Sequence, residues 1–362
     1  MTQQTCLHSQ HVALGGRMVD FAGWDMPLHY GSQVDEHHAV RQNCGLFDVS
    51  HMCAVDVTGA QATDFLRHLL ANDVAKIDAG RAMYSCMLNP EAGVVDDLIV
   101  YRLGEQNYRI VVNAGTAEKD LAWMQSQVSA FTAEVRQRRD LGVLALQGPQ
   151  AADVLASAGL PAQLTAAAQA LKPFRCVAAD ERLLGRTGYT GEDGFEMVLP
   201  LAELPAVWEA LIQAGVQPCG LGCRDTLRLE AGMALYGQDM DDSVNPLIAG
   251  LGWTIAWEPV ERDFVGREAL TTVRAEDSRP RMVGLLLEGR GVLRAHQAVH
   301  AEAGVGEITS GGFSPTLQRS IALARVPAGT SGTVEVEIRN KRVPARVVKY
   351  PFVRHGQAQI EL

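Results

Sequence analysis

An acidic pair, Asp96 and Asp97, interrupts an otherwise apolar run of the chain. The β-branched residues of this run predict a buried strand, in which successive side chains point to opposite faces. Asp97 should therefore share one face with Val95, Ile99 and Tyr101, and Asp96 should lie on the other. Burial and the neighbouring like charge would raise the pKa of at least one carboxyl, which could then hold, give or take a proton near neutral pH. The alternative is a structural pair that accepts backbone hydrogen bonds.

A second polar segment, residues 188–196, holds three glycines and three acids and runs into a predicted strand. Such a loop lets the backbone approach a ligand closely. A phosphate loop would end in Gly-Lys-Ser/Thr, and carboxylates would repel phosphate. The segment favours a neutral or cationic heterocycle, with Glu196 accepting paired N–H donors and Tyr189 stacking on the ring. An acidic turn between strands is the alternative.

Other motifs carry less chemistry. The segment 220–225 resembles half of a dinucleotide fingerprint, but no strand, glycine-rich turn and helix surround it, so we do not expect NAD. The segment 224–233 predicts a helix whose charges form either a structural salt-bridge network or an arginine clamp for a carboxylate. Cys219 and Cys223 lack a second pair of ligands, and we expect no metal. We expect a reaction that relies on positioning and proton handling around a bound cofactor.

Helical and strand patterns alternate over the first 270 or so residues, which predicts an α+β region. A capping box at 58–61 predicts the start of the first helix. The predicted helices are 62–72, 117–128, 149–159 and 205–215. The predicted strands are 54–57, 94–101, 108–113, 142–147 and 195–199.

The pattern changes after the polar, proline-containing stretch 274–280. Short strands separated by Gly and Pro turns then replace helical periodicity, which predicts an all-β barrel or sandwich at the C-terminus. These strands are 282–287, 306–309, 321–326, 333–338 and 343–348. We therefore expect an α+β region over residues 1–275 and an all-β module over residues 276–362.

Composition excludes several classes of protein. The formal net charge of −10 argues against a nucleic-acid protein, because phosphate neutralisation needs a clustered basic surface. The nearest basic cluster is 136–139, which we interpret as a solvated face. No stretch approaches the ~20 apolar residues of a membrane span, and the first residues lack signal-peptide character, so we expect a cytoplasmic protein. The seven cysteines show no disulfide framework.

Taken together, these segments resemble the folate-dependent aminomethyltransferases of the glycine cleavage system, the T-protein family. The match runs nearly end to end. Its blocks are 21–27, 36–41, 45–52, 84–85, 96–98, 111–114, 188–196, 224–233, 246–253, 263–269, 309–311, 314–316 and 351–352. The chain departs from the family pattern at Cys53 and Cys223 and at 91–93, where small residues replace small residues.

The resemblance implies a three-domain cloverleaf around a central folate channel, with a C-terminal barrel or jelly-roll-like domain. It implies two intertwined domains in residues 1–275, the second roughly 53–137. Asp97 corresponds to the essential aspartate of the family, close to the folate nitrogens that take up the one-carbon unit. Glu196 corresponds to the acid that pairs with the pterin. The other implied folate contacts are Met52, Tyr84, Ile99, Tyr101, Val111, Asn113, Tyr189, Arg228, Tyr236 and Arg354.

The implied reaction moves the methylene carbon of an aminomethyl group, carried on the dihydrolipoyl arm of a partner H-protein, to tetrahydrofolate. Ammonia and 5,10-methylenetetrahydrofolate are the products. Two alternatives share the scaffold: a related folate-dependent demethylase, and a non-enzymatic folate-binding accessory protein for iron–sulfur enzymes. The first usually carries a flavin domain when it acts on glycine derivatives, and the second carries a Lys-Gly-Cys-Tyr-x-Gly-Gln-type motif, which this sequence lacks.

Overall fold

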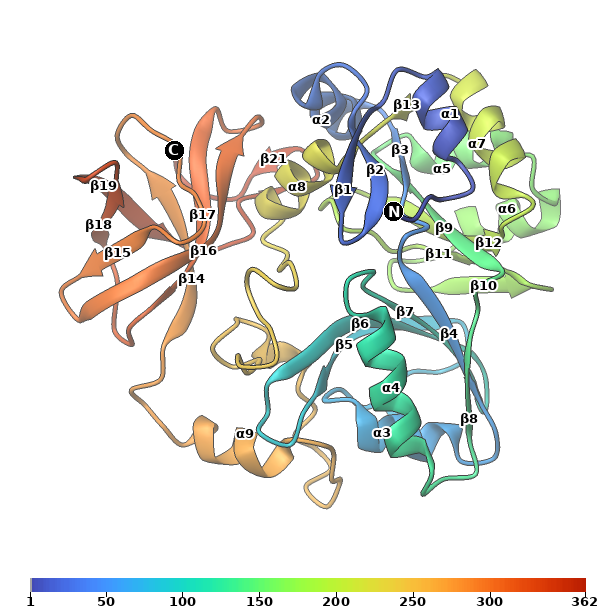
Figure 1. The fold of residues 1–362 in the computed structure, drawn as a ribbon, viewed down its shortest axis with the longest axis horizontal. Coiled ribbons are helices and arrows are strands. Elements are labelled where there is room, and N and C mark those ends of the chain that lie inside the picture. The colour runs from blue at the N-terminus through green and yellow to red at the C-terminus, as the bar shows by residue number, and fades with distance from the viewer. Residues whose placement is uncertain (1) are drawn as a thin grey trace.

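The computed structural model describes residues 2–362 and divides the chain into three lobes, each built on its own sheet (Figure 1). The first lobe is a six-stranded sheet, the second a five-stranded sheet and the third a closed barrel of six strands. The α8 helix and the yellow segment that follows it lie between the lobes in Figure 1. The predicted α+β architecture with a C-terminal barrel is confirmed.

The six-stranded sheet is antiparallel except at one edge, where β13 runs parallel to β3. Its order is β10 (Cys176–Ala179), β11 (Arg182–Gly185), β12 (Gly194–Pro200), β9 (Leu141–Gln147), β3 (Gly45–Asp48) and β13 (Gln217–Pro218). Its helices are α1 (His8–Ala13), α2 (Gln33–Gln42), α5 (Ala151–Val154), η2 (Leu155–Ala158), α6 (Ala162–Gln169) and α7 (Leu204–Gln213). A hairpin of β1 (Arg17–Phe21) and β2 (Trp24–His29) precedes α2. The core packs around the fully buried Trp208 and Phe195.

The five-stranded sheet lies between β3 and β9 in sequence, because the chain leaves the first lobe after β3 and returns at β9. Its order is β5 (Arg81–Leu88), β6 (Val94–Gly104), β7 (Asn107–Val112), β4 (Cys53–Thr58) and β8 (Glu134–Gln137). The helices α3 (Ala62–Leu69) and α4 (Ala117–Val128) pack on it, with η1 (Val74–Lys76) after α3. Phe65 and Met124 anchor these helices to the sheet.

The barrel follows a long segment that holds α8 (Leu221–Glu230), η3 (Gly252–Thr254) and α9 (Arg267–Arg274). Around the barrel the strands are β14 (Arg281–Leu287), β17 (Arg319–Val326), β16 (Gly304–Ser314), β15 (Ala298–Ala301), β18 (Thr333–Ile338) and β19 (Lys341–Val348). The short hairpin of β20 (Val353–Arg354) and β21 (Gln357–Ala358) returns to the first lobe. There the Phe352 and His355 amides donate to the Glu230 and Gly191 carbonyls.

Each helix and strand that the sequence pattern predicts has a counterpart in the structure, although some details differ. The capping box is wrong: Thr58 stays in β4, paired with β7 and β8, and the Gln61 amide oxygen accepts from the Thr132 N–H instead. Helix α3 ends at Leu69 rather than near residue 72. The sequence pattern missed many other elements: the helices α1, α2, α6 and α9, and the strands β1, β2, β3, β5, β8, β10, β11, β13, β15, β20 and β21. We propose that the domain boundaries follow the three sheets.

No helix within residues 2–362 is both long enough and apolar enough to cross a bilayer.

Candidate functional site

Strand β6 carries the acidic pair, and a bulge decides which way its side chains point. Met87 of β5 pairs with Asp96, whereas the next residue, Leu88, pairs with Val94, so that Val95 is the extra residue. Its side chain packs in the same core as Leu98 and Val100. The prediction that Val95 shares a face with Asp97 is therefore wrong, because alternation breaks at a bulge.

Beyond the bulge the alternation holds. Asp97 and Ile99 line a cavity of about 360 Å³, and the Tyr101 hydroxyl reaches Glu196 on the same side. Asp96 is fully buried and faces Asp120 of helix α4 on the opposite side. The predicted opposition of Asp96 and Asp97 is confirmed.

Asp97 has two polar neighbours within its own lobe. The Tyr84 hydroxyl donates to its Oδ2 at 2.7 Å, and the Asn113 side-chain amide donates to its Oδ1 at 2.9 Å. Burial, and then the charge of Asp96, raises the pKa of Asp97 to about 7 despite these donors. At this pKa the carboxyl can both hold and release a proton near neutral pH.

The cavity lies where the second lobe meets the first lobe and the segment that follows α8. Nine of the sequence-predicted site residues line it. They are Met52, Tyr84, Asp97, Ile99, Val111, Asn113, Tyr189, Glu196 and Tyr236. Tyr101 lies behind this wall, fully buried, where it supports Glu196.

Glu196 is held by two hydroxyls on one side only. Thr187 and Tyr101 donate to its Oε2 at 2.6 and 3.1 Å. Within residues 2–362 its Oε1 accepts no hydrogen bond, although the residue lines the cavity. The carboxylate is thus fixed in place and keeps acceptor capacity for a ligand.

The glycine-rich loop has structural reasons for its composition. A Cβ on Gly188 would lie 1.9 Å from the Gln147 side-chain amide, and Gly191 has a φ of +79°. Of its acids, Glu192 pairs with Arg41 and Asp193 with Arg186. Gly188, Tyr189 and Glu196 are therefore the parts of the loop that reach the cavity.

Besides Tyr101, two predicted contacts do not reach the cavity. Arg228 is buried and forms ion pairs with Asp225 and Asp239. For Arg228, the structural salt-bridge network is therefore the correct one of the two alternatives that the sequence offered. Arg354 is exposed on β20 and does not line the cavity. The arginine that does line it is Arg224, one helical turn earlier on α8, whose guanidinium lies 4.6 Å from the centre of the Tyr189 ring.

The sequence pattern also missed His51, which lines the cavity and packs edge-on against Phe21. Burial, and then the charge of Arg224, lowers the pKa of His51 to about 4, so its imidazole is neutral. Its position beside Met52 in a matching block was the signal that could have revealed it.

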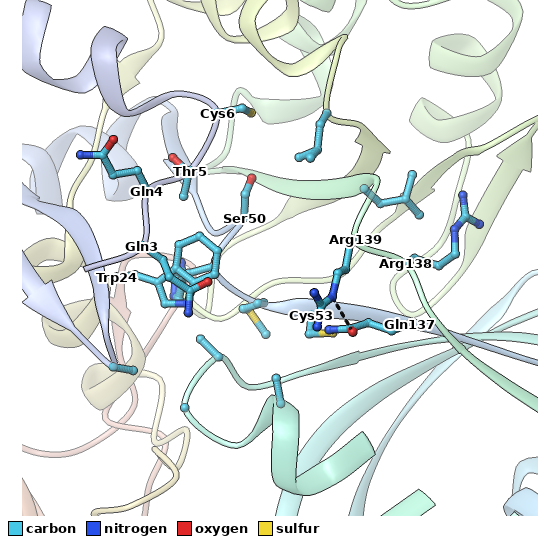
Figure 2. A pocket seen from close by; sticks show the side chains of 18 of the residues that line it. Gln3, Gln4, Thr5, Cys6, Trp24, Ser50, Cys53, Gln137, Arg138 and Arg139 are labelled. Atoms are coloured by element: carbon cyan, nitrogen blue, oxygen red, sulfur yellow. Dashed lines mark hydrogen bonds between the residues drawn. The ribbon is translucent and has the colours of Figure 1, made fainter. Parts of the chain in front are cut away.

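A second cavity, of about 560 Å³, adjoins the first. The two share the lining residues Ala22, His51, Met52, Ala114 and Gly115. In Figure 2, Gln3 and Trp24 lie on one side of the second cavity, and Cys53, Gln137 and Arg139 lie on the other. The Arg139 Nε donates to the Gln137 side chain at 2.8 Å. Within the basic cluster, Arg138 is not free to bind an anion, since it pairs with Asp56, Asp140 and Glu181.

One group of metal-ligand types lies elsewhere, in the core under α8. One ligand atom each of Glu36, Cys219 and Cys223 lies within 4.8 Å of the others. The Tyr30 and Gly220 amides already donate to the two oxygens of Glu36 at 2.6 and 2.9 Å. Burial raises the pKa of the Cys219 thiol well above its usual range, which is typical of inert core cysteines.

Comparison with known proteins gives a consistent result. The GCVT N-terminal domain matches residues 7–259, and the glycine cleavage T-protein C-terminal barrel domain matches residues 281–354. An aminomethyltransferase of Pseudomonas syringae pv. tomato is 57% identical over 99% of this chain and 100% of its own length. One from Methylococcus capsulatus is 54% identical over the full length of both.

A solved structure of the glycine cleavage system aminomethyltransferase T from Bartonella henselae superposes with a TM-score of 0.91 at 37% identity. The match covers 98% of this chain and 99% of that one. Both domain matches, the full-length sequence identity and the fold therefore agree, and the chain belongs to the glycine cleavage T-protein family of aminomethyltransferases.

Proposed function

We propose that this protein is the aminomethyltransferase of a glycine cleavage system. It transfers the methylene carbon of an aminomethyl group, bound to the dihydrolipoyl arm of an H-protein, to tetrahydrofolate. The observation that carries the proposal is Asp97, a cavity-lining carboxyl whose pKa is raised to about 7. Family membership supplies the substrates, and this carboxyl supplies the proton handling that the transfer needs.

Tetrahydrofolate fits the chemistry of the smaller cavity. Glu196 offers a fixed acceptor for the paired N–H groups of the pterin edge. Tyr84, Tyr189 and Met52 offer flat or flexible apolar walls for rings. Arg224, rather than Arg228 or Arg354, is the cation at the wall that would meet an anionic group of the ligand.

The transfer releases two groups from the incoming methylene carbon. Folate N5 attacks that carbon and ammonia leaves, and N10 then closes the ring and displaces the dihydrolipoyl sulfur. N5 and N10 each lose a proton on the way to the product, while ammonia and the thiol carry protons away. Asp97 takes up and returns such protons, a role that its pKa of about 7 favours.

The larger cavity offers a second route to the same centre. It meets the smaller one at His51 and Met52, so an extended arm entering there reaches the wall of the folate site. We propose that the lipoyl arm of the H-protein uses this side. The neutral His51 puts no fixed charge at the junction of the two cavities.

The test is Asp97→Asn, assayed with aminomethylated H-protein and tetrahydrofolate by following ammonia release. Loss of a positioned acid–base group should lower turnover by ~100-fold or more, while tetrahydrofolate still binds. Asp193→Asn, in the glycine-rich loop but paired with Arg186, is the matched control and should keep its turnover. Near-normal turnover of Asp97→Asn with folate bound would remove Asp97 from the reaction.

A further inference from the structure

A third carboxyl, Asp120, lies behind the acidic pair. It belongs to α4 and is fully buried, although this helix is otherwise largely exposed or half-buried. A lone acid on an amphipathic helix normally faces water, because burying a carboxylate without a partner is costly. The position of Asp120 therefore needs a reason.

The hydrogen bonds around the pair supply it. The Asn113 backbone N–H donates to Asp96 Oδ2 at 3.0 Å, and its side-chain amide donates to Asp96 Oδ1 at 2.8 Å. The same amide donates to Asp97 Oδ1 at 2.9 Å. Asn113 thus holds both acids of β6 in fixed positions, and both N–H groups of its side-chain amide are used as hydrogen-bond donors to them.

Asp120 has no such donor. Within residues 2–362, neither of its oxygens accepts a hydrogen bond from an N–H or hydroxyl group. The nearby Thr116 hydroxyl donates to the Asn113 carbonyl at 3.2 Å. The polar side chains beside Asp120 are the carboxyl of Asp96 and the Thr116 hydroxyl. Two carboxyls can form a hydrogen bond only when one of them carries a proton.

Burial raises the pKa of both Asp96 and Asp120, and the donors around Asp96 favour Asp120 as the carrier of the proton. Burial, and then the charge of Asp96, raises the pKa of Asp120 to about 10. Asp96 is the better anion of the two because Asn113 donates to both of its oxygens. The other titratable groups near the two acids are Cys53 of β4, Cys86 of β5, Asp97 of β6, Lys119 of α4 and Tyr236.

Lys119 is the one cation among these neighbours in the described part of the chain, and it is already engaged. Its Nζ lies 2.7 Å from Asp242 Oδ2 and 2.6 Å from the Tyr236 hydroxyl. The three carboxyls at 96, 97 and 120 therefore set one another's charge.

We propose that Asp120 is a positioning residue: as a neutral acid it donates a hydrogen bond to Asp96 and holds Asp96 as the anion that faces Asn113 and Asp97. The negative charge of Asp96 then makes Asp97 hold its proton more tightly than an ordinary carboxyl. Loss of the donor on Asp120 would drive a proton onto Asp96 instead, remove that charge, and let Asp97 ionise at lower pH. The effect on turnover rests on the proposed role of Asp97, whereas the effect on its protonation does not.

The experiment compares Asp120→Asn with Asp120→Ala. The asparagine variant keeps a neutral donor and the alanine variant removes it. Carboxyl ¹³C NMR of protein labelled at aspartate follows the titration of Asp97, whose resonance is the one lost in Asp97→Asn. We expect Asp120→Asn to keep the wild-type midpoint, and Asp120→Ala to lower the midpoint by ~1 pH unit or more. Asp64→Ala, at an exposed position on α3, is the control for a change of net charge.

A structural role alone would lower stability in both variants and leave the Asp97 midpoint in place. Equal midpoints in wild type and Asp120→Ala, or equal shifts in both Asp120 variants, would overturn the proposal. The pH profile of turnover should move with the NMR midpoint. If the NMR midpoint moves and the profile does not, the coupling stands and the proposed role of Asp97 falls.

Infrared spectroscopy keeps the proposal testable if Asp120→Ala does not fold. At pH 9, where Asp97 is ionised and Asp120 keeps its proton, the wild-type protein should show the C=O stretch of a protonated carboxylic acid, and Asp120→Asn should lose it. A spectrum without that band, or a band that survives in Asp120→Asn, would show that Asp120 does not carry the proton.

Discussion

The pKa values of two acids of this protein, Asp97 at the cavity wall and the fully buried Glu230, are shifted in opposite directions. Burial raises the pKa of Asp97 to about 7, with two donors and a neighbouring negative charge around it. Burial acts in the same direction on Glu230, but His37, Arg41 and the Ser314 hydroxyl overcome it and lower the pKa to about 2. Desolvation is common to both, so the surrounding donors and charges decide whether a buried acid is reactive or structural.

The difference also separates two tasks within the fold. Glu230 joins three elements: Arg41 of α2 donates to it at 2.8 Å, and the Ser314 and Thr316 hydroxyls donate from the barrel side. Within residues 2–362, Asp97 accepts side-chain hydrogen bonds only from its own lobe, and it faces a cavity. A fully paired acid stabilises the fold, whereas an incompletely paired one is available for chemistry.

The largest expected effect is on stability, from Glu230→Gln. The variant removes the charge of one of the two buried carboxylates that pair with Arg41, which should cost about 3–5 kcal/mol of unfolding free energy. Urea unfolding at pH 7 measures it. Glu335→Gln is the control, because its pair with Arg342 is exposed and should be worth less than ~1 kcal/mol. Equal losses in the two variants would contradict the comparison.

Asp97→Asn should have a smaller effect on the unfolding free energy, and this substitution should stabilise the protein relative to wild type as the pH rises. In the folded protein Asp97 binds its proton more tightly than in the unfolded chain, so the wild type loses stability as pH rises from about 4 to about 7. The variant does not titrate. Its unfolding free energy should therefore improve relative to wild type by about 2–3 kcal/mol between pH 5 and pH 8.

Thermal or urea unfolding at the two pH values tests this difference. Glu230→Gln serves as the contrast, since the stabilising charge of Glu230 is lost only below about pH 4.5 and its deficit should be the same at pH 5 and pH 8. A pH-independent gap between Asp97→Asn and wild type would mean that the Asp97 pKa is ordinary.

The smallest expected effect is on tetrahydrofolate affinity, and it concerns Glu196, a third acid, which lines the same cavity as Asp97. Glu196→Gln keeps an acceptor for Thr187 and Tyr101 but replaces one ligand-facing acceptor site with an amide donor. Tetrahydrofolate affinity, measured by calorimetry, should fall by about tenfold, or about 1.4 kcal/mol. Asp193→Asn, in the same loop, should leave affinity unchanged, and unchanged affinity in both would remove Glu196 from the site.

Strand alternation in the sequence was enough to separate Asp97 from Asp96, and helix and strand patterns located the elements with the clearest periodicity, whereas short strands such as β3 and β13 were missed. The bulge at Val95 was not foreseeable, because its register depends on how β5 pairs with β6. Arg224 and Arg228 lie one turn apart on one helix, so their spacing could not show which one reaches the cavity. Asp120 was missed because an acidic residue on a helix forms no distinctive sequence pattern. Its proposed role depends on its contact with Asp96 of strand β6, which the sequence does not show.

Helix α8 is only ten residues long, yet all three lobes are fixed to it. Cys223 and Leu227 pack in a core shared by the two sheet lobes, Leu229 packs in the core of the barrel side, and Arg228 donates to Ser310 of the barrel. Because α8 contacts all three lobes, it helps to fix their relative orientation independently of the lengths of the segments that connect them. Insertions in the exposed connecting loops should therefore be tolerated without reshaping the cavity, whereas α8 leaves little room for sequence drift.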